Sequence, residues 1–251
     1  MCIRDRKENF VQPERGAVKK VGMRSSWGRI LRAPGVKTLY GLSFLGWLGR
    51  NMLTPILPLF IATLPLTSGG VNTTIGLIVG VAAATGTLSA MYLGRLGDHT
   101  GHRRILVVCT AVAALLYLPQ SFVTEVWQLL VLQALTGVAV GGFTPSLAAL
   151  LSRLTEPGQE GSVYGLDNAI VSASRTAAPL LGAGVVLLMQ AAGFAGFQYR
   201  ILFVLTGGLF ALAALVALFR LSNAPPPRAE LPARVRVKSA PEAPPPDRRP
   251  S

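Results

Sequence analysis

Two arginines and one aspartate stand inside otherwise apolar stretches of the sequence. Arg50 and Arg175 each lie about twelve residues into such a stretch, which is roughly 18 Å along a helix. Asp167 lies nearer the start of the stretch that holds Arg175. Charged side chains are costly inside a lipid bilayer, and those found there are candidates for function. A guanidinium binds carboxylate or phosphate through paired hydrogen bonds, so the arginines predict a pathway for an anionic small molecule.

Amide side chains add hydrogen-bonding groups to the same stretches, and we assign Asn51, Gln133 and Asn168 to the pathway as well. Proton coupling needs a carboxylate that is neutral in one state. Asp167 is the acid that lies inside an apolar stretch, so it is the candidate for coupling. A structural role stays open, in which either arginine pairs with an acid. Asp167 and Arg175 themselves are roughly 12 Å apart along one helix, too far for close contact.

The composition indicates that a membrane surrounds these residues. Of the 251 residues, 51% are hydrophobic and only 14% are charged, whereas about a quarter of the residues are charged in a soluble domain. Most of the Lys and Arg residues lie in 1–38 and 228–249, so the middle of the chain is almost uncharged. This pattern predicts a membrane protein with basic ends in contact with the lipid bilayer, and nucleic acid is not an expected partner.

Six apolar stretches are long enough to cross a hydrocarbon core of about 30 Å as helices. Backbone groups in lipid must bond within their own segment, so we predict an all-α membrane protein. Basic residues mark the cytoplasmic side, and their distribution places both chain ends in the cytoplasm, across the inner (plasma) membrane. The expected spans are 39–63, 75–93, 105–123, 126–151, 163–189 and 201–219.

The two ends of the chain differ in composition from the six-helix region 39–221. Residues 1–6, MCIRDR, resemble a translated sequencing adaptor, and we expect an N-terminally truncated fragment. We interpret residues 7–38 as a basic cytoplasmic linker. Residues 222–251 are basic and rich in proline, which predicts a disordered cytoplasmic tail.

A polar turn, LGRLGDHTGHRRIL at residues 93–106, separates the second and third expected spans. Its glycines suit a tight turn with positive φ. Its aspartate suits the N-terminus of the next helix, and its arginines hold the turn on the cytoplasmic side. The pattern resembles motif A of the major facilitator superfamily in these residues: Gly94, Leu96, Gly97, Asp98, Gly101, Arg103 and Arg104.

That resemblance implies two six-helix halves around a central substrate site, which opens to each side of the membrane in turn. It also implies that Asp98 latches the cytoplasmic gate by meeting a helix end in the opposite half. His99 and His102 stand where the motif has Arg or Lys. The histidines either weaken the latch, make it sensitive to pH, or replace the basic residues without effect.

Gln133 stands where the first half of this family has an intramembrane arginine, so we interpret the chain as the second half, with the N-terminal half missing. ASRTAAPLLGAG, in the fifth span, resembles a glycine-proline motif of the drug:proton antiporter branch, which includes multidrug and sugar exporters.

The expected function is therefore secondary active transport by alternating access, as proton-coupled efflux of a small molecule. We expect no enzymatic activity, no cofactor and no metal site. Two alternatives remain at this stage. One is a non-transporting membrane scaffold or receptor of the same fold, and the other is an importer of organic anions or sugars.

Overall fold

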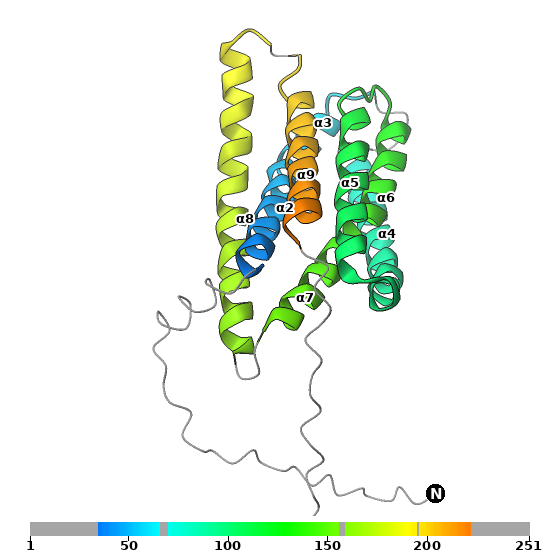
Figure 1. Ribbon diagram of the computed structural model, residues 1–251. Helices are drawn as coiled ribbons and strands as arrows, with labels where there is room; N and C mark the ends of the chain where they lie inside the picture. Colours follow the sequence, from blue (N-terminus) through cyan, green and yellow to red (C-terminus); the bar gives the residue numbers. More distant parts are fainter. Residues whose placement is uncertain (1–34, 66–69, 156–158, 195, 222–251) are drawn as a thin grey trace, which may run out of the picture.

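The computed structural model describes residues 35–65, 70–155, 159–194 and 196–221, and the described residues are mainly helical (Figure 1). The expected adaptor remnant, most of the expected linker and the expected tail at 222–251 lie outside these ranges. The helices are α2 (Val36–Leu53), α3 (Ile56–Ile61), α4 (Val71–Thr100), α5 (His102–Gln120), α6 (Val126–Gly141), α7 (Phe143–Leu154), α8 (Glu160–Ala191) and α9 (Arg200–Arg220).

Six candidate membrane spans are formed by these helices. Helices α4, α5, α8 and α9 are each one span, and the pairs α2–α3 and α6–α7 each form one more. All six are long and apolar enough to cross a bilayer. The prediction of an all-α membrane protein with six spanning helices is confirmed.

The spans form a row in which chain order and spatial order differ (Figure 1). Helix α2 packs between α8 and α9, α9 also packs against α5, α5 packs against α6, and α6 packs against α4. Helices α8 and α4 therefore stand at the two ends of the row. They are also the least buried spans, at 22% and 17% of their apolar windows.

Two of the spans are interrupted. Helix α2 ends at Leu53 and α3 begins at Ile56, with Pro55 between them, because proline lacks the N–H that would continue the helix. Helix α6 ends at Gly141 and α7 begins after Gly142. A Cβ at Gly142 would lie 2.6 Å from the sulfur of Cys109, so a larger residue at this break would force the neighbouring side chains to shift.

Helices α4 and α6 approach each other closely through small residues. A Cβ at Gly141 would lie 2.4 Å from the carbonyl oxygen of Gly86, and Gly137 has an equally close backbone neighbour on α4. The hydroxyl of Ser89 crosses the interface and donates to the carbonyl of Val138 at 2.6 Å. Small residues and interhelical hydrogen bonds of this kind replace the hydrophobic effect as the source of helix association in lipid.

The polar turn differs in two respects from the sequence-based prediction. Helix α4 continues through it to Thr100, seven residues beyond the predicted span, because hydropathy marks the apolar part of a helix and not its end. Gly101 has a positive φ of 98°, but Gly97 is helical. The absence of a side chain at Gly97 makes room for a neighbour, since a Cβ there would lie 2.4 Å from Nδ1 of His102 and would displace that ring.

Candidate functional site

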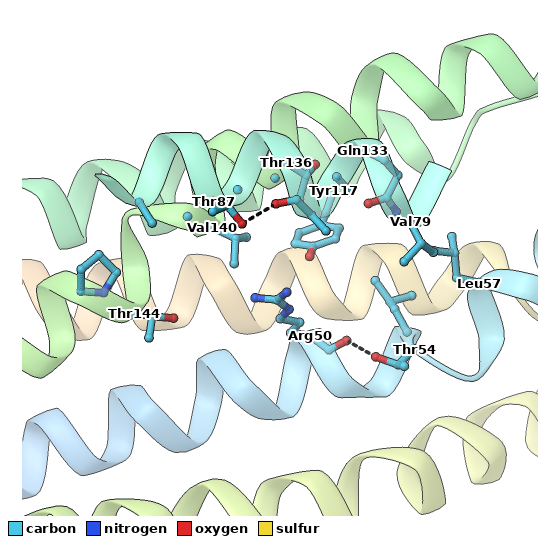
Figure 2. A pocket seen from close by; sticks show the side chains of 18 of the residues that line it. Arg50, Thr54, Leu57, Val79, Thr87, Tyr117, Gln133, Thr136, Val140 and Thr144 are labelled. Carbon is cyan, nitrogen blue, oxygen red and sulfur yellow. Dashed lines mark hydrogen bonds between the residues drawn. The ribbon is translucent and has the colours of Figure 1, made fainter. Parts of the chain in front are cut away.

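A cavity of about 590 Å³ lies between the α2–α3 span and helices α4, α5, α6 and α7 (Figure 2). Small and apolar residues, among them Ala83, Val79 and Val140, form most of its wall. Both helix breaks border it, through Thr54 and Gly141. The polar side chains of the lining are Arg50, Thr54, Thr87, Tyr117, Gln133, Thr136 and Thr144.

Arg50 is the one ionised side chain among the residues that line this cavity. It lies in the last turn of α2, and the hydroxyl of Thr54 donates to its backbone carbonyl at 3.3 Å. Figure 2 shows its guanidinium inside the cavity, with the hydroxyl of Tyr117 turned toward it. A cationic group without a facing carboxylate gives the cavity a positive potential, which favours an anionic guest.

Tyr117 was not a predicted site residue. Its ring is 5% exposed and packs against Phe210 of α9 with a centroid distance of 5.4 Å. This packing fixes the ring, and the hydroxyl is left at the cavity wall. The sequence does contain a signal for Tyr117, because it places a tyrosine inside an apolar span and a buried tyrosine hydroxyl needs a polar partner.

Gln133, a predicted site residue, lines the cavity from α6 together with Thr136 one turn later. Its side-chain nitrogen donates to Oε1 of Gln120 at 3.2 Å. The nitrogen of Gln120 in turn donates to Oγ1 of Thr136 at 2.8 Å. An amide network thus connects the cavity wall to the interior of the bundle.

Arg175, the second arginine that the sequence assigns to the pathway, is not among the residues that line this cavity. It lies on α8 with its guanidinium carbon 4.8 Å from the centroid of the Trp47 ring on α2. The guanidinium carbon of Arg50 lies 5.8 Å from the same ring. Both arginines therefore contact the same tryptophan ring, but only Arg50 is among the residues that line the cavity.

Three further predicted residues also lie away from this cavity. Asn51 donates to the backbone carbonyl of Trp47 on its own helix at 2.7 Å. Asn168 is exposed on α8. Asp167 is half-buried between α8 and α2, where its carboxylate accepts a hydrogen bond from Ser43 at 2.8 Å. No ion pair joins Asp167 to Arg175 in the described part of the chain.

The motif residues lie at the end of α4 and the start of α5, on either side of the break at Gly101. The carboxylate of Asp98 lies 3.1 Å from Nε2 of His102, one helical turn further along the chain. The prediction that Asp98 caps the N-terminus of α5 is wrong, because Gly101 occupies that position without a side-chain cap. Arg103 reaches across to α9 and donates to the carbonyl of Leu218 at 2.6 Å.

The motif turn also leaves Asp98 accessible. Its side chain is 70% exposed, whereas that of His102 is 5% exposed. Gly94, Leu96 and Arg104 complete the predicted motif at the end of α4 and the start of α5. Among the described residues, no group of three or more His, Cys, Asp or Glu side chains could hold a metal ion.

A family model described as Major Facilitator Superfamily matches residues 39–246. Among curated proteins, the chain is 28% identical over 180 residues to "Multidrug resistance protein MdtG" of Salmonella heidelberg (strain SL476), covering 72% of this chain and 43% of that protein. It is also 28% identical over 179 residues to "Multi-drug resistance efflux pump PmrA homolog" of Lactococcus lactis subsp. lactis (strain IL1403), covering 70% and 44%. The chain thus spans less than half the length of these relatives.

A solved structure has the same fold. It is the crystal structure of a bacterial homologue of the human lysosomal transporter Spinster, in an inward-facing and occupied conformation. The TM-score is 0.64 at 16% sequence identity, and the match covers 76% of this chain and 44% of that one. The proteins found by these comparisons are named as transporters or drug-resistance proteins and not as enzymes, in agreement with the sequence-based expectation.

Proposed function

The chain belongs to the Major Facilitator Superfamily, and on this premise we propose that it forms one six-helix half of a secondary active transporter that exports a small organic anion. The observation that carries the proposal is the position of Arg50. Its guanidinium lies in a cavity of about 590 Å³ whose other lining residues are uncharged. A carboxylate in such a cavity gains a charge-assisted hydrogen bond in surroundings of low polarity.

Export by alternating access is supported by the relatives, which are named as a multidrug resistance protein and a multidrug efflux pump. The chain spans less than half of their length, so the proposed working unit has a second six-helix bundle. The exposed sides of α4 and α8, the two ends of the row, are where that bundle would pack. We place the motif turn and both chain ends on the cytoplasmic side of the inner membrane, as the basic residues favour.

Asp167 remains the proposed proton-coupling residue. Its carboxylate is half-buried within a membrane span and accepts a hydrogen bond from Ser43. No basic side chain of the described residues lies within salt-bridge distance of it. A carboxylate in this position can exchange a proton with the aqueous side when the bundle opens. It lies between α2 and α8, away from the Arg50 cavity, so proton and cargo would use separate places.

The test uses the complete transporter in cells that lack other efflux pumps. Cells are loaded with 2-naphthoate, a fluorescent anion, or with ethidium, a fluorescent cation, and the loss of each dye is followed. We expect export of the naphthoate and at least a tenfold slower export in Arg50→Ala. Arg153→Ala, which changes an exposed arginine at the end of α7, is the matched control and should leave the rate unchanged.

Each contrary result removes a separate part of the proposal. Export of ethidium without naphthoate overturns the anionic substrate class. Equal naphthoate export with and without Arg50 removes this residue from the site. Net accumulation of naphthoate in the cells shows an importer. Loss of function on deletion of residues 222–251, with no effect of Arg50→Ala, favours the non-transporting scaffold.

A further inference from the structure

Gln120 is a glutamine with no exposed surface, located at the last residue of α5. Its side-chain nitrogen donates both to the carbonyl oxygen of Leu116, at 3.2 Å, and to Oγ1 of Thr136, at 2.8 Å. Its side-chain oxygen accepts from Gln133 at 3.2 Å. Both ends of the amide are therefore bonded, as a buried polar group in lipid requires. The proposed transport cycle gives this residue no role so far.

The network determines which way each amide faces. The carbonyl of Leu116 can only accept, so the nitrogen of Gln120 must point to it. The oxygen of Gln120 must then point to Gln133, and the side-chain nitrogen of Gln133 must donate the hydrogen bond to it. Thr136 donates its hydroxyl proton to the carbonyl of Leu132 at 2.8 Å, which leaves its oxygen to accept from Gln120. Turning either glutamine over would place like groups against each other.

The orientation of Gln133 decides what the cavity offers to a guest. Its nitrogen is bonded to Gln120, and no donor among the described residues reaches its oxygen. The same side chain lines the cavity that holds the Arg50 guanidinium. The cavity thus combines a cationic group with a hydrogen-bond acceptor, both set in a wall of small and apolar residues.

We propose that Gln120 is a positioning residue that keeps the side-chain oxygen of Gln133 available to the cargo, so that the site selects organic anions carrying an N–H or O–H donor. The substrate class is a hydroxylated or amide-bearing organic acid with an apolar body. This inference rests on the proposed anion transport and adds a second recognition point to it. A site built to pair with a hydroxyl rejects the analogue that lacks one, because its acceptor is then left without a partner.

The experiment compares two fluorescent probes of similar size in the complete transporter. The hydroxyl of 6-hydroxy-2-naphthoate can donate, and the ether of 6-methoxy-2-naphthoate cannot. We expect the apparent KM of the unmodified protein to be about fivefold lower for the hydroxy probe. Gln120→Met and Gln133→Leu should each bring the ratio of the two KM values to about one. In Gln120→Met, which lies outside the cavity lining, the change should come from the KM of the hydroxy probe, with kcat and the KM of the methoxy probe nearly unchanged.

Two further variants keep the test decisive. Gln190→Met replaces an exposed glutamine near the end of α8 and should leave the preference intact. Thr136→Val removes the oxygen that Gln120 bonds to, and it probes the same connection if Gln120→Met does not accumulate in the membrane. A loss of kcat for both probes in Gln120→Met, with the preference retained, would show a structural role and overturn the inference.

The outcome also separates this inference from the proposed function. Export of both naphthoates at the same KM by the unmodified protein keeps anion transport and overturns the selection of a donor. Export of neither naphthoate overturns the anionic class and the inference with it. Strong preference for the hydroxy probe that survives in Gln120→Met overturns the role of Gln120 alone.

Discussion

The guanidinium carbon of Arg175 lies 4.8 Å from the centroid of the Trp47 ring, so a charge on α8 rests on an aromatic face of α2. Arg50 approaches the same ring at 5.8 Å and also reaches the cavity. Two arginines at similar depths along their helices thus have different surroundings. Arg175 contacts a neighbouring helix, whereas Arg50 also lines the cavity.

Arg175→Met should weaken the contact between α8 and α2 and leave cargo affinity unchanged. A cation–π contact at an exposed site contributes about 0.5–1 kcal/mol, so the melting temperature in detergent should fall by a few degrees at most. The apparent KM for 2-naphthoate should stay within about twofold. Arg220→Met, at the exposed end of α9, is the control for removal of a positive charge. A tenfold rise in KM would return Arg175 to the pathway.

Gly141→Ala should destabilise the bundle by forcing α4 and α6 apart. The added Cβ would lie 2.4 Å from the carbonyl oxygen of Gly86, which is backbone and cannot turn away. Overpacking of this kind costs about 1–3 kcal/mol, and we expect a melting temperature lower by several degrees. Gly208→Ala is the matched control, since nothing lies within 4 Å of a Cβ there. Equal melting temperatures in the two variants would show that the interface opens without cost.

Asp98→Asn should slow transport and leave the stability of the bundle nearly unchanged. The carboxylate is 70% exposed and its contact with His102 is solvated, so its loss affects folding by less than about 1 kcal/mol. A latch to the opposite half would lose its charge. Both melting temperature and naphthoate export rate are to be measured. His99→Asn changes an exposed neighbour on the same turn and should have no effect. A normal export rate in Asp98→Asn would exclude the latch.

Asp167→Asn should uncouple transport from the proton gradient. Asparagine has the size of aspartate and can still accept a hydrogen bond from Ser43, but it cannot take up a proton. In inverted vesicles, uptake driven by an imposed pH gradient should disappear, while exchange of labelled for unlabelled naphthoate continues. Ser43→Ala, which removes the donor and keeps the carboxylate, should remain coupled. Gradient-driven uptake by Asp167→Asn would move the coupling site elsewhere.

The six spans were predictable because backbone groups in lipid must form their hydrogen bonds within the protein. A long apolar run satisfies this requirement as a helix. The helix ends were less predictable. Val71–Thr100 extends beyond the apolar run 75–93 at both ends, since a helix can continue into water once the membrane part has formed. The spacing of Gly137 and Gly141 predicts that another helix packs closely against them. That this helix is α4 depends on the tertiary arrangement, which the spacing does not show.

The candidate site was predictable in part. Arg50 and Gln133 are predicted site residues because they are polar and lie within apolar spans, and both line the cavity. Depth along a helix does not give direction around it, however, and a step of one residue turns the side chain by about 100°. Asn51 follows Arg50 directly, but its side chain donates a hydrogen bond to the backbone of its own helix and does not line the cavity. Tyr117 reaches the cavity from α5, and no local sequence pattern shows that its hydroxyl will share this cavity with Arg50 of α2.

The position of α9 in the row has a consequence for how the protein is made. Helix α9, the last of the described helices in chain order, lies between α2, the earliest of them, and α5. At about 5–20 residues per second, α2 waits roughly 7–30 s in the membrane before this neighbour is synthesised. During that interval its buried side, including Gly49 and Leu42, faces lipid or the insertion machinery. Among the described helices, assembly therefore requires α9 to insert between helices made earlier, and a ribosome that stalls before residue 200 leaves α2 and α5 without the helix between them.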